Sequence, residues 1–150
     1  MIRSNSLFLL VIAFSSNTFA DIIYAEILCA QSKAKSTIVI NERIKEFTSR
    51  PLKHGEVAHV SAPGMSNWNS ENRICVTSSV RTSTVNISNG LGDSIVLCAA
   101  DKARSEVSIN QQIATTISKS QSSGFPILEI SQPAQSNWNS ENRICVTLSY

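Results

Sequence analysis

Apolar and polar residues alternate along several short stretches of this chain. Between residues 107 and 117, four apolar residues fall on one parity with mostly polar residues between them: Val107, Ile109, Ile113 and Ile117. The segment STIVI at 36–40 is rich in β-branched residues, and RICVTSSV at 73–80 places Ile and Val on one face and Cys and Thr on the other. Such patterns predict strands. The strands predicted for the first part of the chain are Ile22–Ala30, Ser36–Ile44, Glu56–Ser61 and Arg73–Val80.

The same pattern occurs a second time further along the chain. The twelve residues SNWNSENRICVT stand at 66–77 and again at 136–147, and residues 28–44 align without a gap to residues 97–113. The offset is 69 residues in the earlier stretch and 70 at the twelve-residue motif, so one residue was inserted or lost between them. We therefore predict two repeat units at 21–80 and 94–150, joined by a polar connector at 81–93 that contains glycine.

The repeat predicts an all-β fold. Each unit would contain four short strands separated by turn residues, a spacing that is typical of sandwiches and small barrels. One helical turn is possible at NERIKEF (41–47), but no window carries a sustained apolar stripe of helical period. Because four strands alone leave exposed edges, we expect the tandem duplicated units to form one pseudo-twofold β-sandwich, or else two small β domains.

The first twenty residues predict a signal peptide. Arg3 precedes an apolar run from Leu7 to Phe14, and the stretch ends in Thr18-Phe19-Ala20, with small residues at a suitable cleavage site. The run is shorter than the ~20 residues that span a bilayer, and no later stretch is apolar enough for a membrane helix. We therefore expect a mature chain from Asp21 that is secreted or periplasmic.

Four cysteines stand in the predicted mature part: Cys29, Cys75, Cys98 and Cys145. An even number in an exported chain favours disulfides, although four cysteines allow three pairings. Since Cys29 falls on Cys98 and Cys75 on Cys145 in the repeat, the simplest pairing joins Cys29 to Cys75 and Cys98 to Cys145. The alternative is an intertwined pair bridged between the units. The spacing of the cysteines does not favour a metal site.

The charge pattern gives little support to nucleic acid as a partner. The formal net charge of the whole chain is +2, and the sequence contains no polybasic run and no alternation of basic and aromatic residues.

The residue types also argue against catalysis, and no cofactor is expected. His54 and His59 are the two histidines, and neither belongs to the repeated pattern. The cysteines are expected to be oxidised, which removes a thiol nucleophile. No glycine loop for phosphate, no nucleophile-elbow motif and no metal-binding motif occurs. We therefore expect a protein that is not an enzyme.

Two interpretations of the repeated motif stay open. In the structural one, Asn and Ser side chains satisfy the backbone of a tight loop, Trp68 and Trp138 cover the disulfides, and each glutamate pairs with the nearby arginine. Recent copying of the segment would also preserve it. In the functional one, the loop binds a ligand, because an indole flanked by amides, a carboxylate and a guanidinium suits a sugar ring or a peptide. The candidate ligand-binding residues are Asn67, Trp68, Asn69, Glu71, Arg73, Asn137, Trp138, Asn139, Glu141 and Arg143.

The sequence thus favours an exported binding protein with two equivalent Trp/Asn loops that recognise a repeating carbohydrate or another cell-surface polymer. An alternative is a secreted or periplasmic inhibitor or immunity-type protein that blocks one extracellular protein. Its candidate loops are the unequal stretches KEFTSRPLKHGE (45–56) and TTISKSQSSGFP (115–126). A third possibility is a subunit of a surface assembly, since the chain ends in the strand pattern CVTLSY.

Overall fold

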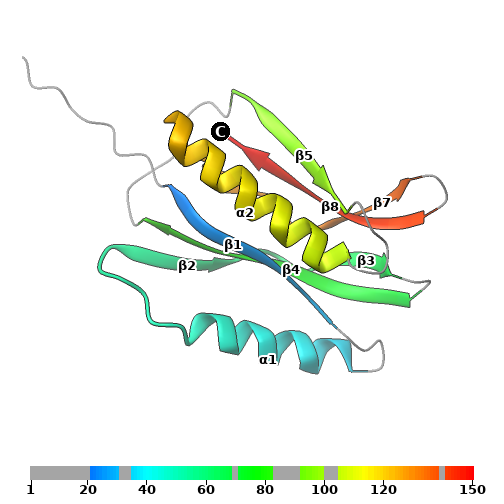
Figure 1. The fold of residues 1–150 in the computed structure, drawn as a ribbon. Coiled ribbons are helices and arrows are strands. Elements are labelled where there is room, and N and C mark those ends of the chain that lie inside the picture. Colours follow the sequence, from blue (N-terminus) through cyan, green and yellow to red (C-terminus); the bar gives the residue numbers. More distant parts are fainter. Residues whose placement is uncertain (1–20, 31–34, 69–70, 83–91, 100–104, 139–140) are drawn as a thin grey trace, which may run out of the picture.

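The fold of the chain is mostly β, with two helices, in a computed structural model (Figure 1). The structure describes residues 21–30, 35–68, 71–82, 92–99, 105–138 and 141–150. The predicted signal peptide and most of the predicted connector lie outside these ranges. Within these ranges, ten elements occur in the order β1–α1–β2–β3–β4–β5–α2–β6–β7–β8. The order β–α–β–β–β is therefore present once in each predicted unit.

The first sheet, called sheet A here, is antiparallel and is built around one long strand. That strand is β4 (Glu71–Thr82), and β1 (Ile22–Cys29) and β2 (Glu56–Val60) pair with its two sides. The short strand β3 (Gly64–Trp68) pairs with the other end of β4. The register places Cys29 directly opposite Cys75.

Sheet B repeats this plan. Its central strand is β8 (Glu141–Ser149), which pairs with β5 (Ser94–Cys98), β6 (Glu129–Ile130) and β7 (Ala134–Trp138), all antiparallel. Cys98 stands opposite Cys145, as Cys29 stands opposite Cys75 in sheet A. The two sheets confirm the predicted β character of the chain.

Two helices correct the all-β prediction. Residues predicted as the strand Ser36–Ile44 form α1 (Ser36–Thr48), and the stretch that contains Ile109, Ile113 and Ile117 lies in α2 (Ser105–Ser123). Residues four apart share a parity, but they also share a helix face. Burial of all three isoleucines of α2 shows that the helical periodicity is the relevant one.

A second correction concerns the motif SNWNSEN, which we predicted as a loop entering the last strand. In each sheet, three of its residues belong to one strand and two belong to the strand that pairs with it. Residues 66–68 lie in β3 and residues 71–72 in β4, and the second copy follows the same course in β7 and β8. Polar side chains do not prevent strand pairing here, because the backbone supplies the ladder hydrogen bonds.

Helix α1 covers one face of sheet A, and α2 lies on the opposite side, beside β1 and sheet B (Figure 1). A smaller core forms between α1 and sheet A, with Ile40 and Phe47 against Leu28 and Val76. The larger core joins both predicted units. Its buried members include Ala25, Ile27, Cys29 and Cys75 from sheet A, Ile109, Ile113 and Ile117 from α2, and Leu97, Ile144, Val146 and Leu148 from sheet B.

The contacts between the two halves are not reciprocal. The Thr77 hydroxyl donates to the Ser131 carbonyl, and Gly64 packs so closely on buried Pro133 that a Cβ at residue 64 would collide with its carbonyl oxygen. At the matching positions Pro63 and Ala134 are both exposed. A twofold axis would exchange equivalent contacts, and these contacts are not exchanged, so the predicted pseudo-twofold arrangement is not confirmed.

Two disulfides close the halves, with the simplest predicted pairing: Cys29 to Cys75 and Cys98 to Cys145. Each joins residues that already face each other in neighbouring strands. Neither described helix is both long enough and apolar enough to cross a membrane.

Candidate functional site

The repeated motif forms the same backbone ladder in both sheets. Trp68 pairs with Glu71 and Asn67 with Asn72, and in the second copy Trp138 pairs with Glu141 and Asn137 with Asn142. We call residues 64–75 and 134–145 hairpin 1 and hairpin 2. Asn69 and Asn139, two of the predicted site residues, lie outside the described residues. The structure therefore places each tryptophan at the last described pair of its hairpin.

Register divides the predicted site residues between two faces of the ladder. Cross-strand partners share a face and successive residues alternate. Positions 68, 71 and 73 of hairpin 1 thus fall on the face of Cys75, while positions 67 and 72 fall on the other. The matching positions of hairpin 2, which include Arg143 opposite Ser136, follow the same pattern. The backbone positions of the tryptophan, glutamate and arginine thus share one face of each hairpin, and the positions of the described asparagines share the opposite face.

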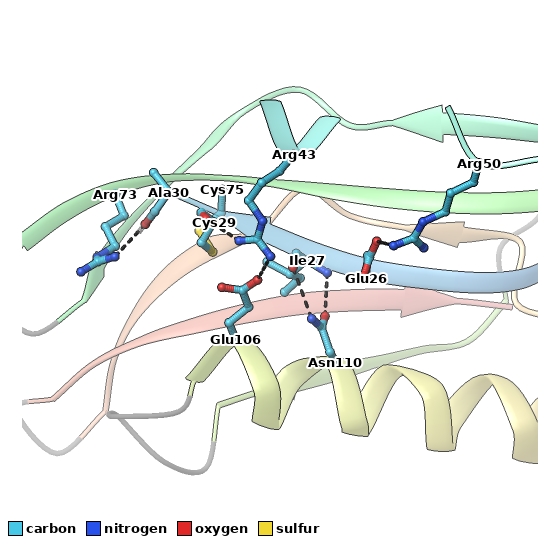
Figure 2. Close-up of polar contacts among 10 residues, drawn as sticks. All are labelled: Glu26, Ile27, Cys29, Ala30, Arg43, Arg50, Arg73, Cys75, Glu106 and Asn110. Atoms are coloured by element: carbon cyan, nitrogen blue, oxygen red, sulfur yellow. Dashed lines mark hydrogen bonds and ion pairs between the residues drawn. A yellow bond between two sulfur atoms is a disulfide. The ribbon is translucent and has the colours of Figure 1, made fainter. Parts of the chain in front are cut away.

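Arg73 has a structural contact that the sequence did not indicate. One guanidinium nitrogen donates to the Ala30 carbonyl at 2.7 Å, just beyond the end of β1 (Figure 2). The Ala30 N–H in turn donates to the Ile74 carbonyl. This arginine therefore helps to fix the chain that leaves the Cys29–Cys75 disulfide, which supports the structural interpretation for this member of the motif.

The two hairpins are neighbours. Strand β3 of hairpin 1 lies against both β7 and β8 of hairpin 2, and the Gly64–Pro133 contact joins the start of hairpin 1 to the residue before hairpin 2. Each hairpin begins opposite a disulfide cysteine, because Gly64 pairs with Cys75 and Ala134 with Cys145. The base of both hairpins is therefore anchored covalently to the sheets.

A network of polar contacts surrounds the free edge of β1 (Figure 2). Arg43 of α1 donates to the Cys29 carbonyl at 2.6 Å and forms an ion pair with Glu106 of α2 at 2.5 Å. Asn110 of α2 accepts from the Ile27 N–H at 2.6 Å and donates to the Ile27 carbonyl at 3.3 Å. These contacts connect both helices to one strand and satisfy backbone groups at an edge that would otherwise be open to pairing.

The Asn110 contact gives a first testable prediction. Asn110→Ala leaves two partly buried backbone groups of Ile27 without their amide partner, at a cost of about 1–3 kcal/mol in the free energy of unfolding. Asn41 stands at the matching position of α1 and is exposed. Asn41→Ala therefore gains the same helix propensity, but it leaves the hydrogen bonds to Ile27 in place. Urea unfolding of both variants measures the difference. Equal stability of the two would contradict a contribution from the Ile27 contact.

A second cluster joins β1 to the end of α1. The Arg50 guanidinium lies 5.5 Å from the Tyr24 ring centroid and 5.2 Å from that of Phe47. It also donates to the Tyr24 hydroxyl and pairs with Glu26, each at 3.1 Å. Burial raises the pKa of Tyr24 above its ordinary value, against the smaller opposing effect of the Arg50 hydrogen bond. The phenol is therefore neutral at physiological pH, and its ring packs against Phe47 and Arg50.

No group of His, Cys, Asp and Glu within the described ranges could hold a metal ion. His54 and His59 are both exposed. In comparisons with known proteins, no family model, no curated protein and no solved structure matches this chain.

Proposed function

We propose that the protein is an exported, non-catalytic binding protein whose two hairpins recognise a repeating ligand such as a glycan or a cell-surface polymer. The observation that carries this proposal is the identical register of Trp68 with Glu71 and of Trp138 with Glu141. An indole position beside a carboxylate position on one face of the hairpin offers both stacking area and a hydrogen-bond acceptor.

We also propose that the chain arose by tandem duplication, with the two copies arranged head to tail. The support is the repeated order of elements and the matching strand register in both sheets. A head-to-tail stack sets equivalent features side by side in the same sense, whereas a twofold axis would turn them towards each other. Two adjacent hairpins with the same chemistry suit a ligand whose own units repeat in one direction.

Two equivalent sites on one body raise the overall affinity for a polymer without new contacts, because the second binding event becomes intramolecular. The expected ligand is therefore a chain with at least two copies of the recognised unit. A single unit is expected to bind weakly, through one hairpin at a time.

The test uses Trp68→Ala, Trp138→Ala and the double variant, with Met65→Ala as a control. Met65 is an exposed residue of hairpin 1 that is not part of the repeated motif. Each single variant is expected to weaken retention on a glycan array by about tenfold or more, and the double variant to abolish it. Circular dichroism and thermal unfolding check that the fold is intact.

Two results would contradict the proposal. Loss of folding in either single tryptophan variant would favour the structural interpretation of the motif. Capture of one stoichiometric extracellular protein, with no retention on any glycan, would favour the inhibitor alternative instead.

A further inference from the structure

A hollow of about 320 Å³ lies at the C-terminal end of α2, next to Asp93, the residue that precedes β5. This volume is at the lower end of the ~300–1,000 Å³ that is usual for small-molecule sites. The hollow lies in the second half of the chain and takes no residue from hairpins 1 and 2. Its lining residues are Asp93, Lys119, Ser120, Ser123, Phe125 and Tyr150.

The corresponding place in the first half is filled by the Arg50 cluster. Tyr24 stands opposite Val80 in sheet A, and the matching pair in sheet B is Asp93 and Tyr150, whose backbones are joined by a 3.0 Å hydrogen bond. Residues of α2 stand 69 positions after their counterparts in α1, so Thr116 corresponds to Phe47 and Lys119 corresponds to Arg50. The three large side chains that stack on each other in the first half are thus replaced by smaller ones, whereas Val80 is replaced by the larger Tyr150.

Phe125 is held in place by the end of α2. Gly124 has a positive φ of 74°, its N–H donates to the Gln121 carbonyl, and the Phe125 N–H donates to the Ser120 carbonyl. This pair of hydrogen bonds is the Schellman arrangement that ends many helices. The Ser120 hydroxyl also donates to the Phe125 carbonyl. Phe125 is 70 % exposed although its backbone is fixed, so the hollow has an apolar side chain on a backbone that is already ordered.

The charged residues of the hollow are of opposite sign and do not pair. Neither Asp93 nor Lys119 forms an ion pair with another residue that the structure describes. Both side chains are exposed at the rim. The hollow therefore offers one acceptor for a cation, one donor for an anion, and two aromatic rings.

We propose that this hollow binds a small zwitterion of the amino-acid class with an apolar side chain. Asp93 accepts hydrogen bonds from the ammonium group, Lys119 donates to the carboxylate, and the side chain lies against Phe125 and Tyr150. Charge-assisted hydrogen bonds to both charged groups of the ligand give the selectivity, and the aromatic contact gives most of the buried area. The site is independent of the hairpins.

The experiment titrates the ¹⁵N-labelled protein with three probes: L-phenylalanine, phenethylamine, which lacks the carboxylate, and 3-phenylpropionate, which lacks the ammonium group. L-Phenylalanine is expected to shift amide resonances around residues 119–125 in a saturable way, at millimolar concentration. Each singly charged probe is expected to bind about tenfold more weakly, since each loses one charge-assisted contact.

Variants of Asp93 and Lys119 test which residue binds the ammonium group of the ligand and which binds the carboxylate. Asp93→Asn should weaken L-phenylalanine binding and leave 3-phenylpropionate unchanged, while Lys119→Gln should weaken L-phenylalanine and leave phenethylamine unchanged. Phe125→Ala should weaken all three, and the exposed Lys45→Gln on α1 should change none. Absence of a saturable shift with L-phenylalanine would overturn the proposal. Equal binding of the three probes, or shifts confined to other residues, would overturn it as well.

Discussion

Replacement of Cys29 and Cys75 together by alanine is expected to lower the free energy of unfolding by about 4 kcal/mol, the chain-entropy value for a loop of this length. The two cysteines are 46 residues apart in the sequence and close a loop that contains α1, β2 and β3. Both are fully buried in the core that joins the two halves. The loss of packing around the removed sulfur atoms adds to the entropic cost.

The second disulfide is a matched control for this effect. Cys98 and Cys145 close a loop of nearly the same length, at a separation of 47, so the entropic term is the same. Their sheet face, however, carries Val96 at 62 % exposure, where the matching Ile27 of sheet A is fully buried. We therefore expect dithiothreitol to reduce the Cys98–Cys145 bond first.

Mass spectrometry after timed reduction and alkylation measures the order in which the bonds open. Urea unfolding of the two double-alanine variants compares their stabilities, and the Cys98→Ala/Cys145→Ala variant should lose less. Simultaneous reduction, or the opposite order of loss, would show that the burial of Cys29 and Cys75 does not protect them.

Three strands were predicted closely. The ends of β1, β2 and β4 all lie within two residues of the predicted ends. In RICVTSSV the alternation is unambiguous, because Ile74 and Val76 belong to the core under α1 whereas Cys75 belongs to the core under α2. A strand buried on both faces still keeps the two sets of side chains apart.

The helices could not be predicted from the same pattern. A spacing of four residues, as in Ile109, Ile113 and Ile117, fits both a strand and a helix. The discriminating signal was the residues between them: Gln111 and Thr115 share the parity of the isoleucines, and a strand would have buried these polar side chains as well. In α1 the β-branched run STIVI concealed the helix, since tertiary packing overrides such propensities.

The cysteine pairing was predicted from the duplication, because repeats place equivalent residues in equivalent structure. The hairpins were not predicted, since β3 and β7 end in the motif that we expected to be a loop. Contacts that occur once could not be found in this way. Asn110 meets Ile27 across 83 residues of sequence, and Arg50 meets Tyr24 across 26. The hollow beside Phe125 is present in the second half, whereas the matching positions of the first half are filled by the Arg50 cluster, so it is a difference between the two described halves.

The burial of α2 on two sides has the second large consequence for stability. In the first half α1 contacts β1 and β4 of its own sheet, whereas α2 contacts β5 and β8 of sheet B and also β1 of sheet A. The burial of two matching isoleucines differs accordingly. Ile113 of α2 is fully buried, and Ile44 of α1 is partly exposed. The same side chain at the same repeat position therefore has two different environments.

Ile113→Ala is expected to lower the free energy of unfolding by about 3–5 kcal/mol, near the top of the range for a buried isoleucine, because neighbours on both sides of α2 cannot all move to fill the cavity. Ile44→Ala removes the same atoms from a partly exposed site and should cost about 1–2 kcal/mol. Urea unfolding monitored by tryptophan fluorescence and by circular dichroism gives both values. In a chain whose halves share one core, the two probes should report one transition for Ile113→Ala. Equal costs for the two variants would instead mean that α2 packs on sheet B alone.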